Sequence, residues 1–166
     1  MEGIAQLDLS VPGPEDTFAT AVAEHYAGLV RRLTAVLGDR EEAQDVAQEA
    51  YLRAYRAWDR FDGTDPRAYL HTIGLRLAFN ERQRRIRWSR LLGRGDPQPA
   101  WVHEEDRSLH DALRGLRAEH RAALLLNVVD GYTQAEVAVM LEVAPGTVAS
   151  WLARSKAQLR KALTDA

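Results

Sequence analysis

Arginine side chains gather in the middle of the chain, together with aromatic and amide side chains. The group comprises Arg76, Arg82, Arg84, Arg85, Arg87, Tyr69, His71 and Asn80. Guanidinium groups clamp phosphates in a planar fork, and aromatic and amide side chains suit contact with bases. A solvated helix face usually mixes charge signs more evenly. The pattern therefore favours contact with nucleic acid over a merely soluble helix.

The last predicted helix, 146–163, offers a second surface of this kind. If Val148 points inward, steps of 100° per residue bring three more residues to the same side, namely Leu152, Ser155 and Leu159. The opposite side carries Gly146, Ser150, Ala153, Arg154, Ala157 and Lys161. Small residues let a backbone approach a groove, and the two cations can reach phosphates or guanine edges. Trp151 falls at the boundary, and we expect its ring to pack against the preceding helix.

A short helix and a tight break precede this last helix, which is the helix-turn-helix order. Thr133 is placed to cap the short helix, and Glu136 three residues later would complete a capping box. A small shared core is expected from Val137, Leu141, Val148, Leu152 and Leu159. Another kind of helical hairpin could share this pattern, so periodicity alone leaves DNA contact open.

Catalytic and metal-binding motifs are missing from the sequence. It contains no phosphate-binding loop and no HExxH, and the absence of cysteine excludes disulfides, zinc ribbons and thiol catalysis. The nearest approach to a metal-ligand set is His103, Glu104, Glu105 and His110, which lacks ligand-like clustering. We expect no enzyme activity, no cofactor and no metal.

Charge is strongly segregated along the 166 residues, although the net charge is only −2. Residues 1–50 contain 10 acidic and 3 basic side chains, a net charge of −7. Residues 51–95 contain 4 acidic and 11 basic side chains, a net charge of +7. A surface that faces a polyanion is therefore expected within 51–95.

Helical periodicity runs through most of the chain and predicts an all-α fold. The expected helices are 17–37, 40–59, 65–88, 107–116, 118–130, 134–141 and 146–163. Glycine and proline are frequent in 91–106, which predicts a flexible linker between two small helical domains, 17–90 and 107–166. Residues 1–16 are expected to be a disordered acidic tail. They lack the features of a signal peptide or a membrane anchor, so we expect a cytoplasmic protein without membrane insertion.

The predicted helix 40–59 has an apolar stripe and a polar ridge. The stripe contains Val46, Ala50, Ala54 and Trp58, continues to Phe61 just after the helix, and is expected to be core. The ridge contains Asp45, Gln48, Glu49 and Arg53. By periodicity alone, this ridge is explained by an intrahelical Glu49–Arg53 pair, which contributes only a few tenths of a kcal/mol.

Three stretches resemble conserved regions of one protein family. DREEAQDVAQEAYLRAYRAWDRFDG and PRAYLHTIGLRLAFNERQRR are similar to region 2 of group IV sigma factors, the extracytoplasmic-function family of bacterial RNA polymerase. LRAEHRAALLLNVVDGYTQAEVAVMLEVAPGTVASWLARSKAQLRKAL is similar to region 4. The resemblance covers roughly residues 17–88 and 107–164, in the family's order. It implies two all-α domains, a region 2-like domain and a region 4-like helix-turn-helix domain.

The resemblance also implies three functional surfaces. The surface that docks on the polymerase clamp would comprise Asp45, Gln48, Glu49 and Arg53. Recognition and melting of the minus-ten element would use Asp62, Gly63, Thr64, Asp65, Arg67, Tyr69, His71, Arg76, Asn80, Arg82, Arg84 and Arg85. Recognition of the minus-thirty-five element would use Thr133, Thr147, Ser150, Trp151, Arg154 and Lys161.

This chain departs from the family pattern at several of these positions. Where the family usually has Trp, Asn and Asp along the third helix, this chain has Tyr69, Arg76 and Asn80. Glu142 replaces the glycine common before the turn, and Leu116-Arg117 replaces a Leu-Pro pair. Ala149 and Trp151 replace basic residues of the recognition helix. These changes leave the architecture intact and bear on which promoter is read.

The expected function is therefore that of a sigma factor, a monomer when free. It would direct core polymerase to specific promoters through the beta-prime clamp and the beta flap, with an anti-sigma factor as a further partner. Two alternatives stay open. One is a helix-turn-helix regulator that binds DNA by itself, and the other is a sigma-like decoy that binds an anti-sigma protein without engaging DNA.

Overall fold

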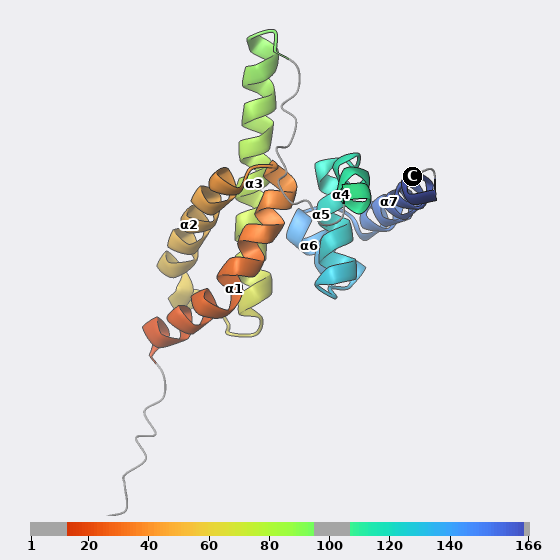
Figure 1. The fold of residues 1–166 in the computed structure, drawn as a ribbon. Helices are drawn as coiled ribbons and strands as arrows, with labels where there is room; N and C mark the ends of the chain where they lie inside the picture. Colours follow the sequence, from red (N-terminus) through yellow and green to blue (C-terminus); the bar gives the residue numbers. More distant parts are fainter. Residues whose placement is uncertain (1–12, 95–106, 165–166) are drawn as a thin grey trace, which may run out of the picture.

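The computed structural model describes residues 13–94 and 107–164, which we call the first and the second unit (Figure 1). The first unit contains α1 (Pro14–Leu37), α2 (Arg40–Arg56), a 3-10 turn η1 (Trp58–Arg60) and α3 (Pro66–Leu91). The second unit contains α4 (Arg107–Arg114), α5 (Ala118–Leu124), a π-helical turn η2 (Leu125–Val129), α6 (Gln134–Leu141) and α7 (Pro145–Thr164). Within these two ranges there is no strand, and the all-α prediction is confirmed. The acidic tail and most of the predicted linker lie outside the described residues.

Local capping sets the starts of the helices. Asp65 accepts a hydrogen bond from the Ala68 backbone N–H at 2.9 Å, and Pro66 occupies the first helical position of α3. At the start of α2, Asp39 accepts from the Glu42 backbone N–H at 2.8 Å. The predicted helices are confirmed, and their ends differ by a few residues because terminal turns fray or change type.

The core of the first unit forms where α1, α2 and α3 meet. Alanines on one face of α2 are fully buried, and they let the helix approach α1 closely: Ala43, Ala47, Ala50 and Ala54. Leu29 and Leu33 of α1 are also fully buried. A Cβ atom at Gly74 of α3 would lie 2.8 Å from Leu29 Cδ1, so α1 and α3 are in close contact at this point.

The second unit packs α7 against α4, α5 and α6. Val148, Leu152 and Ser155 of α7 are buried, as the helical wheel predicts, and Leu159 is half-buried. Val137 and Ala138 supply the facing side of α6. This confirms the small shared core of the helix-turn-helix.

The two units are in contact, through α1 with α5 and through α3 with α6 (Figure 1). The C-terminal part of α3 projects beyond α1 and α2, away from this contact (Figure 1). The polar composition of the linker predicts connected but separate domains, and no local pattern indicates that they touch.

No single helix in the described ranges is long and apolar enough to cross a membrane. Only α6 and α7 together, bent by 106°, meet the length and composition required.

Candidate nucleic-acid interface

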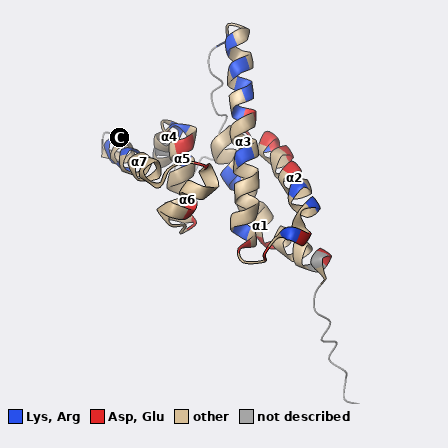
Figure 2. Ribbon diagram, turned by 180° about the vertical axis from the view of Figure 1, so that it is seen from behind, with Lys and Arg blue, Asp and Glu red and all other residues tan. Residues whose placement is uncertain are grey.

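Arginine residues recur along the projecting part of α3 (Figure 2). Arg84 pairs with Glu81 on the same helix at 2.7 Å, and its side chain remains 67% exposed. Asn80 is exposed and Arg82 is half-buried. This part of α3 therefore presents cations and amides to solvent, as the sequence predicts.

Arg85 is held more firmly than its neighbours on α3. Its guanidinium donates to the Glu42 carboxylate of α2 and, at 2.8 Å, to the Leu37 carbonyl at the end of α1. Burial raises the pKa of Glu42 and the nearby Arg85 charge opposes that rise, while the Glu81 and Asp39 charges add to it. In this structure Arg85 joins three helices of the first unit.

The loop before α3 is exposed at all four of its predicted site residues, Asp62, Gly63, Thr64 and Asp65. The Asp62 carboxylate accepts a hydrogen bond from the Thr64 backbone N–H at 3.0 Å. That bond and a second one from the Thr64 side chain lower the pKa of Asp62. Gly63 has φ of 78°, a conformation that glycine adopts at little cost. The loop is thus a turn whose conformation is fixed by the Asp62–Thr64 hydrogen bond and by Gly63, and it favours the charged form of the Asp62 carboxylate.

Aromatic rings pack beneath this loop. Tyr69 stacks on Phe61 with ring centroids 4.7 Å apart, and Trp58 lies 4.9 Å from Phe61. The sequence predicts Trp58 and Phe61 as core and Tyr69 as a DNA contact. The structure brings all three together, so one face of Tyr69 is already occupied by protein.

His71 and Arg67 lie where the second unit covers α3. His71 is only 1% exposed, and its ring lies 6.3 Å from that of Tyr132 in the second unit. Arg67 ion-pairs with Asp130 and lies over the Tyr132 ring at 5.2 Å. Both are predicted minus-ten contacts; in this arrangement His71 is buried, and Arg67 is engaged by Asp130 with its side chain still 38% exposed. Periodicity could not have revealed this, because Asp130 and Tyr132 are more than 60 residues away in sequence.

Two positions where the chain departs from the family pattern meet across the units. Arg76 of α3 pairs with Glu142, the residue after α6, at 3.0 Å. Glu142 has φ of 55°, and among the described residues it alone is a non-glycine with positive φ. A left-handed residue other than glycine is unfavourable by roughly 1–2 kcal/mol. This chain therefore holds a strained backbone at a position that also carries an ion pair to α3.

The polar ridge of α2 is accessible. Asp45, Gln48 and Arg53 are exposed, and the expected Glu49–Arg53 pair is present at 2.7 Å. Apolar side chains flank the ridge, which the helical periodicity did not indicate. Leu52 is 52% exposed and Tyr55 is 50% exposed. The surface thus combines charge with apolar area, which is the usual composition of a protein-binding patch.

The outer face of α7 has the character predicted for it. The exposed residues include Gly146, Ala149, Ala153, Arg154, Ala157 and Lys161. Thr147 and Ser150 are half-buried. Thr133 forms the predicted capping box, in which its hydroxyl accepts from the Glu136 backbone N–H at 3.2 Å. Thr133 therefore has a structural role at the start of α6.

Trp151 is a half-buried residue at the rim of α7, as predicted. Its ring lies 5.5 Å from that of His120 on α5. The expected partner was the preceding helix, and the observed ring contact is with α5 instead. On the helical wheel of α7, Trp151 lies roughly 80° from the direction that faces the core, and this side of the helix is next to α5.

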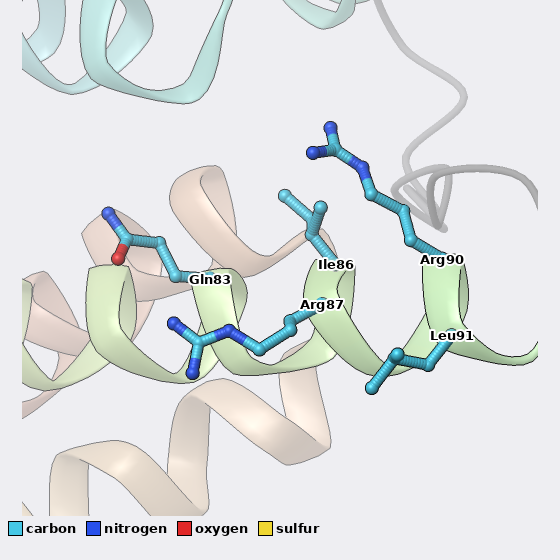
Figure 3. Close-up of a pocket in the computed structure, with 5 residues that line it drawn as sticks. All are labelled: Gln83, Ile86, Arg87, Arg90 and Leu91. Atoms are coloured by element: carbon cyan, nitrogen blue, oxygen red, sulfur yellow. The ribbon is translucent and has the colours of Figure 1, made fainter.

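A shallow hollow of about 450 Å³ lies at the end of α3. Its lining residues are Gln83, Ile86, Arg87, Arg90 and Leu91, which all project from this one helix (Figure 3). The hollow is an open surface of α3 rather than an enclosed pocket. In the part of the chain that the structure describes, no three His, Asp or Glu side chains are grouped to hold a metal ion. His103, Glu104 and Glu105 lie outside that part.

Two family models match the chain in sequence order. Sigma-70 region 2 matches residues 21–88, and sigma-70 region 4 matches residues 106–159. The first match spans most of α1, α2 and α3, and the second spans α4 to most of α7. Each unit of the structure therefore corresponds to one region of the family.

Curated relatives agree with these matches. The chain is 33% identical to the ECF RNA polymerase sigma factor SigL of Mycobacterium tuberculosis, over 86% of each chain. It is 29% identical to the ferric citrate uptake sigma factor FecI of Escherichia coli, over 84% of this chain and 86% of FecI.

Solved structures show the same fold. RpoE of Bartonella quintana, solved with the anti-sigma factor NepR, has a TM-score of 0.75 at 21% identity, covering 89% of this chain and 97% of RpoE. CnrH, solved with the cytosolic domain of CnrY, has a TM-score of 0.64 at 25% identity, covering 91% of this chain and 90% of CnrH. Because regions 2 and 4 match in sequence order, and the relatives and the fold agree, this chain belongs to the extracytoplasmic-function group of the sigma-70 family of RNA polymerase sigma factors.

Proposed function

We propose that this chain directs core RNA polymerase to specific promoters. It would bind DNA through two surfaces and the polymerase through a third. The observation that carries this proposal is the pairing of regions 2 and 4 in one chain, each with an exposed face suited to DNA. The α3 face displays arginines, and the α7 face displays small residues beside Arg154 and Lys161. Two modest surfaces on one molecule bind more tightly than either alone when both can engage together.

The minus-ten surface is proposed to run from the loop at 62–65 along α3. An exposed, charged turn next to a cluster of aromatic rings suits capture of an extruded base, and the arginines of α3 suit the phosphates around it. In this proposal Tyr69 acts mainly by supporting the loop through its stack on Phe61.

The minus-thirty-five surface is proposed to be the outer face of α7. Arg154 and Lys161 supply its cations, and Trp151 acts from the rim by fixing α7 against α5. Since this face carries few cations, the phosphate contribution to binding is small, and we expect weak affinity for isolated duplex DNA.

The polymerase surface is proposed to be the ridge of α2 with its flanking Leu52 and Tyr55. The location would then be the cytoplasm, where transcription takes place in bacteria. An anti-sigma factor is proposed as a further partner. Its support is that CnrH was solved in complex with another protein, the cytosolic domain of CnrY.

Run-off transcription with purified core polymerase tests the proposal. We expect initiation at discrete start sites on a genomic template library when the chain is added, and none with core polymerase alone. A stand-alone regulator would instead bind duplex DNA specifically without polymerase. A decoy would give no promoter-specific transcripts, and that result would contradict the proposal.

Charge reversal on α2 tests the polymerase surface. Replacing Asp45 and Glu49 with lysine is expected to weaken binding to core polymerase by about tenfold or more, which is ~1.4 kcal/mol, because it reverses the charge of the surface proposed to meet the partner. Affinity is measured by titrating labelled core polymerase, and helical content by circular dichroism.

The matched control is the double variant Glu24→Lys with Asp111→Lys, which makes the same change in net charge at exposed positions on α1 and α4. We expect it to bind polymerase like the parent. Equal affinities for the two double variants would remove the assignment of α2.

A further inference from the structure

One carboxylate in the second unit holds two arginines of the first unit. Asp130 accepts two hydrogen bonds from Arg32 of α1, from Nε at 2.5 Å and from Nη2 at 2.7 Å. It also ion-pairs with Arg67 in the first turn of α3. Its side chain is only 6% exposed. The contact is therefore a buried carboxylate in a fork of two guanidinium groups.

Both cations belong to the first unit. Arg32 and Arg67 come from the adjacent helices α1 and α3. Among the described residues, Asp130 is the one carboxylate that ion-pairs with either of them. Burial tends to raise the pKa of Asp130, but the hydrogen bond and charge of Arg32, with the charge of Arg67, outweigh it and lower that pKa. If the second unit moved away, two like charges would remain side by side without their counter-ion.

His71 completes this cluster. It lies one helical turn after Arg67, and both of its ring nitrogens are buried without a hydrogen-bond partner. A buried polar group without a partner is unfavourable and indicates a site whose partner comes from elsewhere. Arg32 and Arg67 therefore hold one anion, and His71 lies close enough to sense its charge while its own ring nitrogens have no partner.

The geometry of this cluster suits a phosphate as well as a carboxylate. An arginine fork binds carboxylate and phosphate oxygens in the same two-bond manner. Arg67 and His71 lie on α3, between the exposed loop at 62–65 and the basic residues further along the helix, and Arg32 lies on the neighbouring helix α1. A nucleic-acid strand that followed α3 from the loop to these basic residues would pass Arg67 and His71 on its way.

We propose that Arg32, Arg67 and His71 form a cradle for a backbone phosphate of the promoter strand, and that Asp130 fills this cradle when the two units are closed. This inference rests on the proposed function and adds to it a residue of α1, Arg32, and an internal competitor. Closure of the units and binding of the strand exclude each other. The pair Arg76–Glu142 supports the closed form, and the outer face of α7 remains exposed in it.

The test measures binding of a fluorescein-labelled 12-nucleotide single-stranded DNA to the full chain by anisotropy. Asp130→Asn keeps the shape of the side chain and removes its charge. We expect about tenfold tighter binding, because a larger fraction of molecules has an open cradle. The control Asp111→Asn removes an equal charge from an exposed position on α4 and is expected to change affinity little.

A second substitution separates a phosphate ligand from a mere latch. In the Asp130→Asn background, Arg32→Gln should weaken binding about tenfold and reduce the slope of log affinity against log salt by ~0.7, the value for one phosphate of a single strand. The control is Arg31→Gln in the same background, which changes the exposed neighbouring arginine of α1. If the Arg32 and Arg31 variants behave alike, Arg32 is only a latch and the cradle is wrong.

Two further measurements use the parent chain and therefore test the cradle even if Asp130→Asn folds poorly. In the parent chain, fluorescent labels on α2 and α7 should move apart when the oligonucleotide binds, and an uncharged methylphosphonate strand should not produce this change. A 12-residue polyglutamate probe that binds as well as DNA would overturn the nucleic-acid assignment. Promoter-specific transcription alongside failure of these results would leave the proposed function standing and remove the cradle. Loss of transcription alone would count against the proposed function.

Discussion

Replacing Arg121 with leucine is expected to lower the free energy of unfolding by about 3–5 kcal/mol. Arg121 is 2% exposed and donates to the carbonyls of Ala35 at 2.5 Å, Leu116 at 3.0 Å and Leu113 at 3.1 Å. Ala35 and Leu113 lie near the ends of α1 and α4, where helix carbonyls lack intrahelical partners and carry partial negative charge. One guanidinium thus serves acceptors in both units.

The size of this effect follows from what the substitution leaves behind. Exchanging both members of a buried polar pair for apolar groups can be nearly neutral, but the backbone carbonyls cannot be exchanged. Burial lowers the pKa of Arg121 to about 10, and the nearby charge of Arg82 acts in the same direction, so the side chain stays charged at neutral pH. Leucine would therefore leave the buried carbonyls of Ala35 and Leu116 without this donor, while the Leu113 carbonyl keeps the Leu116 backbone N–H.

Urea unfolding followed by circular dichroism measures the change. The control is Arg117→Leu, in the turn before α5, where the side chain is 77% exposed. We expect that variant to change stability by less than about 0.5 kcal/mol. A loss below about 1 kcal/mol for Arg121→Leu would show that water or another donor replaces the guanidinium.

Acidification is expected to destabilise the folded chain between about pH 6.5 and pH 4 through His71. Burial lowers the pKa of His71 to about 4, with Asp130 opposing the shift and the charges of Arg67, Arg32 and His25 adding to it. Tyr132 is the ring that faces it from the second unit. The unfolded chain takes up a proton near the ordinary histidine value, and the folded chain does not.

The sign follows from this difference in proton binding. The contribution of neutral, buried His71 to stability is fully present above the pKa that His71 has in the unfolded chain. Below that pKa the free energy of unfolding falls by at most about 1.4 kcal/mol per pH unit. At pH 5 the expected loss is about 2 kcal/mol. The pKa of Asp130 is lowered, so its own contribution is lost only in more acid solution.

The measurement is urea unfolding at pH 7 and pH 5, with His71→Phe as the comparison. Burial also lowers the pKa of His120, so the raw pH dependence contains a second contribution of the same sign. The difference between the parent chain and His71→Phe isolates His71. Parallel pH dependence in the two proteins would mean that His71 becomes solvated or paired without unfolding.

Local sequence was sufficient to predict the helices, the capping box of the helix-turn-helix and the family. The Thr133–Glu136 capping box and the inward face of 146–163 both depend on residues within a few turns of each other. Capping and helical periodicity depend on residues close together in the chain, so they can be predicted from a short stretch of sequence. The two sigma regions could be recognised for the same reason.

What each charged or aromatic residue contacts could not be predicted in this way. Arg32 meets Asp130 across 98 residues, Arg85 meets Glu42 across 43, and Trp151 meets His120 rather than a neighbour in sequence. These partners depend on how complete helices pack and on the contact between the two units. Helical periodicity shows which side of a helix faces outward, but only the packed chain shows which outward arginines remain free for DNA and which already hold a carboxylate.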